Sequence, residues 1–260
     1  MPMFFQVLAS GSKGNSVLVC SSKTRVLIDA GLSGKELARR LGKSPIEASE
    51  LDAVVVSHEH QDHVRGVGVI SRRFDLPIFL TRGTLDNMPS QVGQLPSVQI
   101  FQSGVSFSIG DLHFHPFAIS HDAKEPVGFV VENNGCKLGV CTDLGVATQL
   151  VKTRLMDCQG LVLEANHDVE LLLNGPYPWE LKQRIRSRHG HLSNADTCQL
   201  LRSLHHANLQ SVVFAHLSEI NNNPKLVEKC YGELVQCDEW RCVQFHIGKQ
   251  HEATSGVEIC

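Results

Sequence analysis

His58-Glu59-His60-Gln61-Asp62-His63 is the stretch of sequence that decides the fold of this chain. It follows the short apolar run of residues 53–56, which predicts a strand buried on both faces. Neutral imidazoles and a carboxylate are suitable ligands for Zn²⁺ or Mn²⁺. Residues two apart in an extended segment point the same way, so His58 and His60 can bind one ion. Asp62 and His63 point elsewhere, because the chain turns into a helix there, and can bind a second ion. The alternative is a polar loop whose histidines cap that helix.

Further along the chain, three polar residues each stand just past the end of an apolar run that predicts a strand: His121, Asp143 and His216. The ends of such strands can converge on one edge of a core, where sites in layered folds commonly lie. Each residue alone would more often be an ordinary loop residue. Together with the histidine-rich stretch they predict a site for two metal ions.

The composition places the chain among ordinary folded proteins. It has 260 residues and a net charge of -3. Because 42% of the residues are hydrophobic, wholesale disorder is excluded. No apolar run approaches the roughly 20 residues of a membrane span, and the start lacks the basic region of a signal peptide. Nine irregularly spaced cysteines predict reduced thiols and a cytoplasmic location. Because the net charge is negative, any nucleic-acid binding must come from a local patch.

The organisation of the chain predicts one domain over residues 1–260, since no repeat, low-complexity stretch or long linker divides it. Short apolar runs dominate the first half, and the last third shifts toward helical patterns. This order predicts β-sheets packed face to face with helices outside. The helices expected in the last third span residues 146–155, 179–188, 193–205 and 224–235.

The motifs, taken in order, resemble those of the metallo-β-lactamase-fold hydrolases. The resemblance rests on Leu-Ile-Asp-Ala-Gly at residues 27–31, on residues 58–63, and on His121, Asp143 and His216. Within that superfamily the chain is most similar to the YycJ/WalJ-like branch. The segments that carry this second resemblance are residues 8–16, Leu-Ala-Ser-Gly-Ser-Lys-Gly-Asn-Ser; 190–194, Gly-His-Leu-Ser-Asn; and 216–222, His-Leu-Ser-Glu-Ile-Asn-Asn.

The resemblance implies an α/β fold, the αββα sandwich, with two mixed sheets packed face to face and a two-metal site at their edge. It implies that one ion binds His58, His60 and His121. The other ion binds Asp62, His63 and His216, and Asp143 bridges the two. It also places residues 164–168 near the site. Characterised members of the branch are Mn²⁺-dependent nucleases that degrade DNA from 5′ ends.

Differences from other members of the superfamily argue against several of their activities. His60 stands where relatives that reduce oxygen or nitric oxide at two irons typically carry Glu, which argues against that chemistry. The signal peptide and Cys ligand of penicillin-degrading relatives are not evident. The protruding arm of the long tRNA-processing relatives is missing as well.

Two segments bear on substrate binding. Residues 182–191 hold four cations and two histidines, and as a helix they would form a phosphate track that includes Arg186 and Arg188. The alternative is a solvated helix face. Residues 10–16 are glycine-rich, so with Ser12 and Asn15 they could form an anion nest, or equally a plain hairpin turn.

The catalytic candidates are Asp62, Asp143 and His191. A hydroxide between two metal ions needs no protein nucleophile, but the departing sugar oxygen benefits from a proton. His191 is the candidate donor, with a cap of its turn as the alternative. Ser193 and Asn194, at a helix start, are expected to hold a phosphate oxygen. Asp29, which ends the apolar run of residues 26–28, is expected to orient a ligand imidazole.

The sequence therefore predicts a metal-dependent phosphodiesterase with two Zn²⁺ or Mn²⁺ ions. It is expected to act on nucleic acid, with DNA favoured, as a 5′ to 3′ exonuclease that uses a metal-bridging hydroxide. The alternative is a small-molecule hydrolase of the same fold that cleaves a thioester, a lactone or a cyclic phosphodiester. A third possibility is a metal sensor or scaffold with a vestigial site; the complete set of ligands argues against it. No membrane partner is expected.

Overall fold

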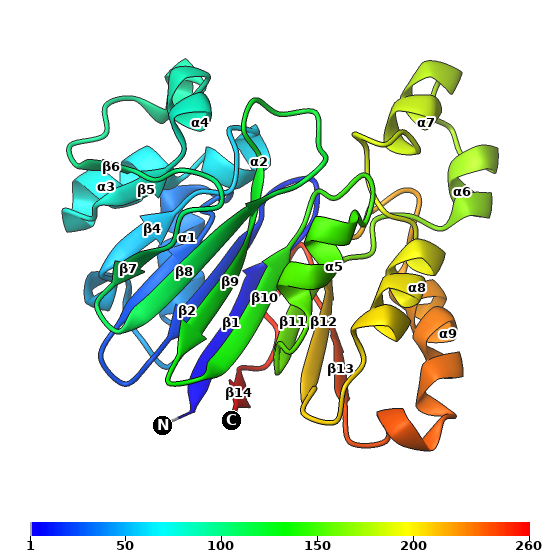
Figure 1. Cartoon of the computed structure of the whole chain (residues 1–260). Coiled ribbons are helices and arrows are strands. Elements are labelled where there is room, and N and C mark those ends of the chain that lie inside the picture. The colour runs from blue at the N-terminus through cyan, green and yellow to red at the C-terminus, as the bar shows by residue number, and fades with distance from the viewer. Residues whose placement is uncertain (1) are drawn as a thin grey trace.

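Two β-sheets packed face to face form the centre of the computed structural model, which describes residues 2–260 (Figure 1). Within that range each sheet has seven strands. Sheet A contains, in spatial order, β14 (Val257–Ile259), β1 (Met3–Ala9), β2 (Ser16–Cys20), β3 (Arg25–Ile28), β4 (Ala53–Val55), β5 (Ile78–Leu80) and β6 (Val98–Ile100). Sheet B contains, in the same sense, β13 (Gln244–Ile247), β12 (Ser211–Ala215), β11 (Gly160–Glu164), β10 (Cys136–Cys141), β9 (Val127–Asn133), β8 (Leu112–Ala118) and β7 (Phe107–Ile109).

The two sheets follow the same pattern of strand directions. In sheet A, β1, β2 and β3 are antiparallel neighbours, and β3 to β6 then run parallel. In sheet B, β8, β9 and β10 are antiparallel neighbours, and β10 to β13 then run parallel. Parallel strands end at the same edge of a sheet, so each sheet presents several strand ends along one edge.

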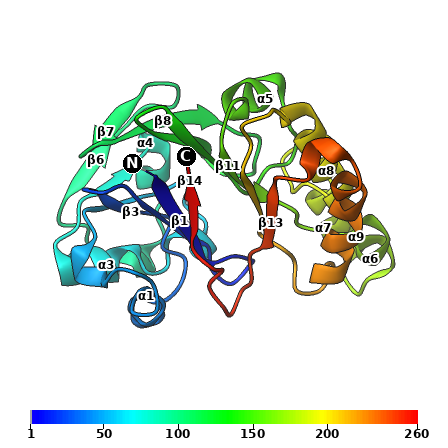
Figure 2. The ribbon, with the colours of Figure 1, turned by 90° about the horizontal axis from the view of Figure 1, so that it is seen from below.

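Helices cover the outer faces of the sandwich. Those of the first half are α1 (Gly34–Leu41), α2 (Gln61–Val64), α3 (Val67–Phe74) and α4 (Arg82–Asp86). Those of the second half are α5 (Gln149–Leu155), α6 (Val169–Asn174), α7 (Trp179–Ile185), α8 (Asn194–Leu204) and α9 (Pro224–Val235). Short 3₁₀ turns lie at η1 (Ala48–Glu50), η2 (Ser90–Val92) and η3 (Asp238–Trp240). Figure 2 shows α1 and α3 outside one sheet and α5, α8 and α9 outside the other.

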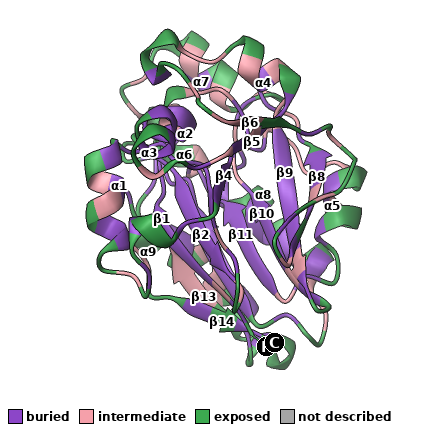
Figure 3. Ribbon diagram, turned by 90° about the vertical axis from the view of Figure 1, so that its left-hand side faces the viewer, coloured by how far each residue is buried: buried purple, intermediate pink, exposed green. Residues whose placement is uncertain are grey.

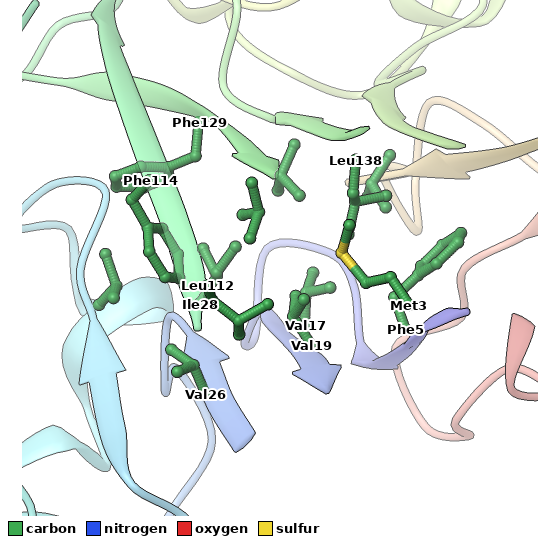
Figure 4. Packing of buried hydrophobic residues seen from close by; sticks show 14 of the residues in the cluster. Met3, Phe5, Val17, Val19, Val26, Ile28, Leu112, Phe114, Phe129 and Leu138 are labelled. Atoms are coloured by element: carbon green, nitrogen blue, oxygen red, sulfur yellow. The ribbon is translucent and has the colours of Figure 1, made fainter. Parts of the chain in front are cut away.

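The core explains why the sheets face each other. Apolar side chains of both sheets meet between them, among them Phe5 and Val19 of sheet A and Phe114, Phe129 and Leu138 of sheet B (Figure 4). Two further clusters lie between each sheet and its helices. The central strands are therefore buried on both faces, whereas the edge strands β6, β7 and β13 are partly exposed and the helices expose their outer sides (Figure 3). The predicted αββα sandwich is confirmed.

The helix expected over residues 179–188 is shorter than predicted, because α7 ends at Ile185. The chain turns back there, and the backbone N–H of His191 donates to the carbonyl of Ile185 at 2.8 Å. Gly190 makes this turn possible, since a Cβ atom at that position would lie 2.1 Å from the same carbonyl oxygen. The helix expected at 193–205 is α8 with Ser193 as its cap, and α9 matches residues 224–235.

The expectation that the thiols are reduced is wrong for two cysteines. Cys136, at the start of β10, forms a disulfide with Cys260, which directly follows β14. Two strands that belong to different sheets are thereby joined. The cysteines described as free are Cys20, Cys141, Cys158, Cys198, Cys230, Cys237 and Cys242. Among the helices of residues 2–260, none combines the length and the apolar character needed to cross a bilayer.

Candidate metal centre

The predicted metal ligands gather at one edge of the sandwich. His58 to His63 follow β4, His121 follows β8, Asp143 follows β10 and His216 follows β12. In Figure 1 this edge is at the top, where α2 lies, and β14 ends at the opposite edge. A cavity of about 250 Å³ opens there, and His60, Asp62, His121, Asp143, His191 and His216 line it. The seven predicted metal ligands therefore come from four segments that are distant in sequence.

The first group of donors consists of His58, His60 and His121, whose ligand atoms lie within 4.8 Å of one another. Nε2 of His121 lies 3.2 Å from Nδ1 of His60. Nδ1 of His121 lies 3.2 Å from the carbonyl oxygen of Gly190, to which it donates, so Nε2 is the nitrogen left to bind an ion. This is the set that the sequence predicts for one ion.

The second group consists of Asp62, His63, Asp143 and His216, again with ligand atoms within 4.8 Å. Nε2 of His63 lies 3.1 Å from Oδ2 of Asp143 and 3.5 Å from Oδ2 of Asp62. Nε2 of His216 lies 3.4 Å from the same Asp62 oxygen. Oδ1 of Asp143 is also 3.8 Å from Nε2 of His121 in the first group. Asp143 therefore reaches both groups.

Three of the residues at this edge have a left-handed backbone. Asp29, Asp143 and His216, which follow β3, β10 and β12, have φ of 61°, 58° and 56°. Residues other than glycine adopt this conformation at a cost, which Asp and His tolerate better than most. Each strand is thus followed by an abrupt turn that points a polar side chain across the edge.

Asp29 holds the imidazole of His63 from behind. Its Oδ2 lies 2.8 Å from Nδ1 of His63 and 2.8 Å from Oγ of Ser57, and its Oδ1 accepts the backbone N–H of Ser57 at 2.8 Å. Nδ1 of His63 donates to this carboxylate, so Nε2 faces the donor group. The structure therefore places Asp29 behind the imidazole of one predicted metal ligand.

Glu164, at the end of β11, likewise orients imidazole rings, in this case those of two histidines. Its Oε1 lies 2.8 Å from Nδ1 of His216 and 2.7 Å from Nδ1 of His191. Its Oε2 accepts the backbone N–H groups of Leu144 and Leu192 at 2.7 and 3.0 Å. Burial alone would raise the pKa of Glu164, but the charge of His191 and these hydrogen bonds lower it to about 2. The resemblance places residues 164–168 near the site, but it does not name the two imidazole partners of Glu164, which follow β12 and α7.

Backbone packing positions the histidine-rich stretch. Asn15 donates its backbone N–H to the carbonyl of Asp62 at 2.7 Å, and Ala30 donates to the carbonyl of His63 at 2.8 Å. Gly31 lies between them, and a Cβ atom there would be 1.6 Å from the Asp62 carbonyl oxygen. The Asp-Ala-Gly sequence after β3 is therefore required for this close approach.

The polar atoms of the site fit divalent metal ions. Nε2 of His58 and Oδ2 of Asp143 are buried and form no hydrogen bond within the described chain, although Nε2 of His63 lies 3.1 Å from the Asp143 oxygen. Buried polar atoms are normally paired, so two unpaired atoms that face neighbouring donors indicate ligands. Imidazoles with carboxylates are a donor set for Zn²⁺ or Mn²⁺ and do not suit Ca²⁺ or Mg²⁺.

The pKa values of the buried histidines differ within the site. Burial lowers the pKa of His58 well below its usual value, and the nearby imidazoles of His63, His121 and His60 add to this. Burial also acts on His63, but the carboxylates of Asp143, Asp29 and Asp62 outweigh it and raise its pKa well above the usual value. Burial favours the protonated form of Asp143, yet the charges of His216 and His63 hold its pKa well below normal.

Most of the predicted substrate residues lie outside the cavity lining. Ser12 lines the cavity, but Asn15 instead extends its amide to Oδ2 of Asp62 and Nε2 of His63, each at 3.1 Å. Ser193 caps α8, and the buried Asn194 hydrogen-bonds Asn222. The structure therefore brings Ser12 to the site, and it uses Asn15 to position metal-binding residues.

The basic run of residues 182–191 does not form one cationic face. Lys182 is buried, and its Nζ donates to the carbonyl of Leu173 at 2.8 Å. Arg186 and Arg188 lie after α7, and both are exposed and outside the cavity lining. The expected continuous track along a helix is wrong, because the helix ends too early and one of its cations serves the fold.

Residues that are not candidate metal ligands complete the cavity wall. Arg184 of α7 lines the cavity and pairs with Asp122, to whose Oδ2 its Nε donates at 2.7 Å. Oδ1 of Asp122 lies 3.4 Å from Nε2 of His121. Tyr177 and Leu181 line the same wall. The sequence offers two signals for this wall, which are the basic run that contains Arg184 and the position of Asp122 next to His121.

Comparisons with known proteins agree with this geometry. A family model described as the beta-lactamase superfamily domain matches residues 24–217, which include all seven predicted metal ligands. The exodeoxyribonuclease YycJ of Bacillus anthracis is 35% identical over 238 residues, which are 91% of this chain and 90% of that protein. The exodeoxyribonuclease WalJ of Streptococcus pneumoniae is 35% identical over 249 residues, 94% of this chain and 92% of that protein. The crystal structure of the metallo-beta-lactamase fold protein YhfI from Bacillus subtilis superposes with a TM-score of 0.73 at 15% sequence identity. The match covers 99% of this chain and 100% of that chain.

Proposed function

This chain belongs to the beta-lactamase superfamily and to the family of the YycJ and WalJ exodeoxyribonucleases, and on that premise we propose that it is a metal-dependent 5′ to 3′ DNA exonuclease. The observation that carries the proposal is the pair of adjacent donor groups that share Asp143. His58, His60 and His121 are the ligands proposed for one ion. Asp62, His63 and His216 are proposed for a second, with Asp143 between them. Zn²⁺ and Mn²⁺ both suit five imidazoles and two carboxylates.

When bound, two such ions supply a hydroxide near neutral pH and offset the charge that develops on the phosphate oxygens. The protein has three remaining tasks: to hold the ligands, to bind the phosphate beside them and to protonate the departing oxygen. Asp29 and Glu164 perform the first by fixing the imidazoles of His63 and His216. Both carboxylates are buried, so water does not compete for these hydrogen bonds.

His191 is the residue proposed to hold the proton for the departing oxygen. Its Nδ1 is engaged by Glu164, so Nε2 is the nitrogen that can face a substrate in the cavity. Burial lowers the pKa of His191, but the Glu164 carboxylate outweighs this and raises its pKa above the usual value. A histidine that keeps its proton near neutral pH is suited to act as a general acid.

Phosphate binding is proposed for the wall that α7 forms. Arg184 lines the cavity there, and a substrate phosphate can replace its partner Asp122. Arg186 and Arg188 are exposed on the turn that follows, and residues 181–195 contain no carboxylate. This local positive surface favours a polyanion over a small neutral ester, although the chain as a whole carries a charge of -3.

The proposal is tested with protein purified without added metal. Metal content is measured first, and cleavage is then measured on 5′-labelled DNA, on RNA and on esters. We expect two bound ions and stepwise removal of nucleotides from 5′ ends of DNA. Asp143→Ala should lose metal and most of this activity. Efficient cleavage of a thioester or lactone without action on DNA would support the small-molecule alternative instead.

A charge variant separates these alternatives further. The double variant Arg186→Gln/Arg188→Gln removes two exposed cations that are not metal ligands. We expect it to slow DNA degradation and to leave cleavage of bis(4-nitrophenyl) phosphate unchanged. Arg241→Gln is the matched control, since Arg241 is exposed and its guanidinium pairs only locally with Asp238 of the same turn. Equal losses on both substrates would argue against a nucleic-acid track.

A further inference from the structure

Asp122 lies between a cation and the first group of metal-binding histidines. It directly follows His121 in sequence, and like Arg184 it lines the cavity. Nε and Nη2 of Arg184 both donate to the same carboxylate oxygen, Oδ2, with Nε at 2.7 Å. The other oxygen, Oδ1, lies 3.4 Å from Nε2 of His121 and 4.0 Å from Nε2 of His60. Arg184 therefore binds one oxygen of this carboxylate, and the other lies beside two proposed metal ligands.

The position of Oδ1 fits an ion shared with His121. Nitrogen and oxygen ligands lie about 2.0–2.2 Å from Zn²⁺, so neighbouring ligands of one ion are roughly 3.0–3.6 Å apart. Nε2 of His121 is 3.2 Å from Nδ1 of His60 and 3.4 Å from Oδ1 of Asp122. In this structure the three histidines form a donor group without Asp122. The carboxylate must turn away from Arg184 to join that group.

The first donor group has no carboxylate of its own. Its three imidazoles share Asp143 with the second group, which also contains Asp62. Two buried carboxylates lie behind the histidines of the second group, whereas Nδ1 of His121 donates to a backbone carbonyl and Nδ1 of His58 lies 2.9 Å from a hydroxyl. Less negative charge therefore surrounds the first ion. A further carboxylate would offset the charge of that ion and supply the kind of oxygen ligand that suits Mn²⁺.

We propose that Asp122 is a ligand of the ion held by these three histidines, and that Arg184 competes with the ion for its carboxylate. The inference rests on the proposed function, since it concerns the same metal centre. The side chain of Arg184 is 65% exposed and that of Asp122 is 29% exposed, and ion pairs so close to water are readily exchanged. A substrate phosphate that binds Arg184 releases Asp122 to the ion, so phosphate binding and metal binding favour each other.

The experiment measures metal affinity in the full chain after its metal has been removed and replaced by Co²⁺. Competition with a chelator gives the affinity for each ion. Asp122→Asn should weaken the binding of one ion at least about 10-fold, the least that loss of a partner of a metal site usually costs, and should spare the other ion. Arg184→Gln should strengthen the same ion about 2- to 5-fold, because a largely exposed competitor is removed.

Asp238→Asn and Arg241→Gln are the matched controls for these two variants. Nη2 of Arg241 lies 2.9 Å from Oδ1 of Asp238, and this exposed ion pair is outside the cavity lining. Neither control should change the affinity for either ion. If Asp122 and Arg184 merely hold the cavity wall in place, both of their variants should shift the affinity in the same direction. That result would overturn the competition.

The double variant Asp122→Asn/Arg184→Gln separates contact from charge at a distance. Because Arg184 is proposed to act through Asp122, the double variant should match Asp122→Asn. A gain of affinity from Arg184→Gln that persists without the carboxylate would overturn the competition. The visible absorption of Co²⁺ depends on the number and kind of its ligands, so it should change in Asp122→Asn. An unchanged spectrum would overturn ligation by Asp122 alone, whereas a wild type that binds no pair of ions would overturn the proposed function as well.

Discussion

Nδ1 of His191 lies 2.7 Å from Oε1 of Glu164, so the ring is anchored at one nitrogen while the other is available to the cavity. The same carboxylate oxygen lies 2.8 Å from Nδ1 of His216. A histidine proposed as a proton donor and a histidine proposed as a metal ligand therefore share one buried anion. The position of the donor relative to the metal centre depends on β11, which ends at Glu164.

His191→Ala should reduce turnover on DNA about 10²–10⁴-fold, the usual contribution of a general acid, while both metals stay bound. The loss should shrink on a nitrophenyl phosphodiester, because its leaving group needs no proton. Steady-state kinetics on both substrates and metal analysis check this. His189→Ala is the control, since His189 is exposed on the same turn. Equal losses on both substrates would reject the role of proton donor.

Asp29→Asn should weaken metal affinity roughly 10–100-fold without removing a ligand, as loss of a carboxylate behind a metal-binding histidine does. The amide cannot accept hydrogen bonds at both ends from Ser57 and His63. Competition with a chelator measures the affinity. Asp111→Asn is a matched control, because Asp111 accepts hydrogen bonds from Ser21 and Thr24 away from the site. Unchanged affinity in Asp29→Asn would show that His63 does not need this partner.

His167 predicts a loss of stability in mild acid. Burial lowers its pKa from 6.5 to about 4, and its Nδ1 has no hydrogen-bond partner within residues 2–260. As pH falls below 6.5, His167 binds a proton in the unfolded chain, whereas in the folded chain it stays neutral until about pH 4. The cost to the free energy of unfolding is about 2 kcal/mol near pH 5. Urea unfolding near pH 7.5 and pH 5 should show this difference in wild type and not in His167→Gln.

The disulfide predicts a stability that depends on redox conditions. Cys136 and Cys260 are 124 residues apart, and closing a loop of that length stabilises the folded state by up to about 5 kcal/mol in the chain-entropy view. Dithiothreitol should therefore lower the unfolding midpoint of the wild type. Cys260→Ser should match the reduced wild type and should not respond to dithiothreitol. A wild type indifferent to the reductant would mean that the bond does not form in solution.

The local patterns that the sequence shows account for the fold and for the arrangement of the predicted ligands. The apolar run of residues 53–56 became β4, and the polar residues after four strands meet at one edge because parallel strands end together. Gly31 illustrates why the motif around it is needed, since no side chain fits against Asp62. Such features depend on residues that are close in sequence or at strand ends.

What the sequence does not reveal depends on contacts between distant segments. Lys182 reads as a surface cation, but the carbonyl of Leu173 draws it into the fold. The sequence marks Arg184 as one cation of a basic run and gives Tyr177 no role, and only the return of the chain at Gly190 brings their segment over the site. The pairing of Cys136 with Cys260 follows from the neighbouring places of β10 and β14, which no cysteine spacing indicates.

The shared pattern of strand directions in the two sheets divides the chain into two similarly built halves, although the sequence shows no repeat. His58, His60, Asp62 and His63 come from the first half, and His121, Asp143 and His216 from the second. Each proposed ion thus takes ligands from both halves and acts as a cross-link between them. The affinity for metal should therefore change if one sheet shifts relative to the other. Removal of the metal ions should raise hydrogen exchange first along the edge where the metal-binding residues lie. The apolar layer between the sheets should still keep the two halves together.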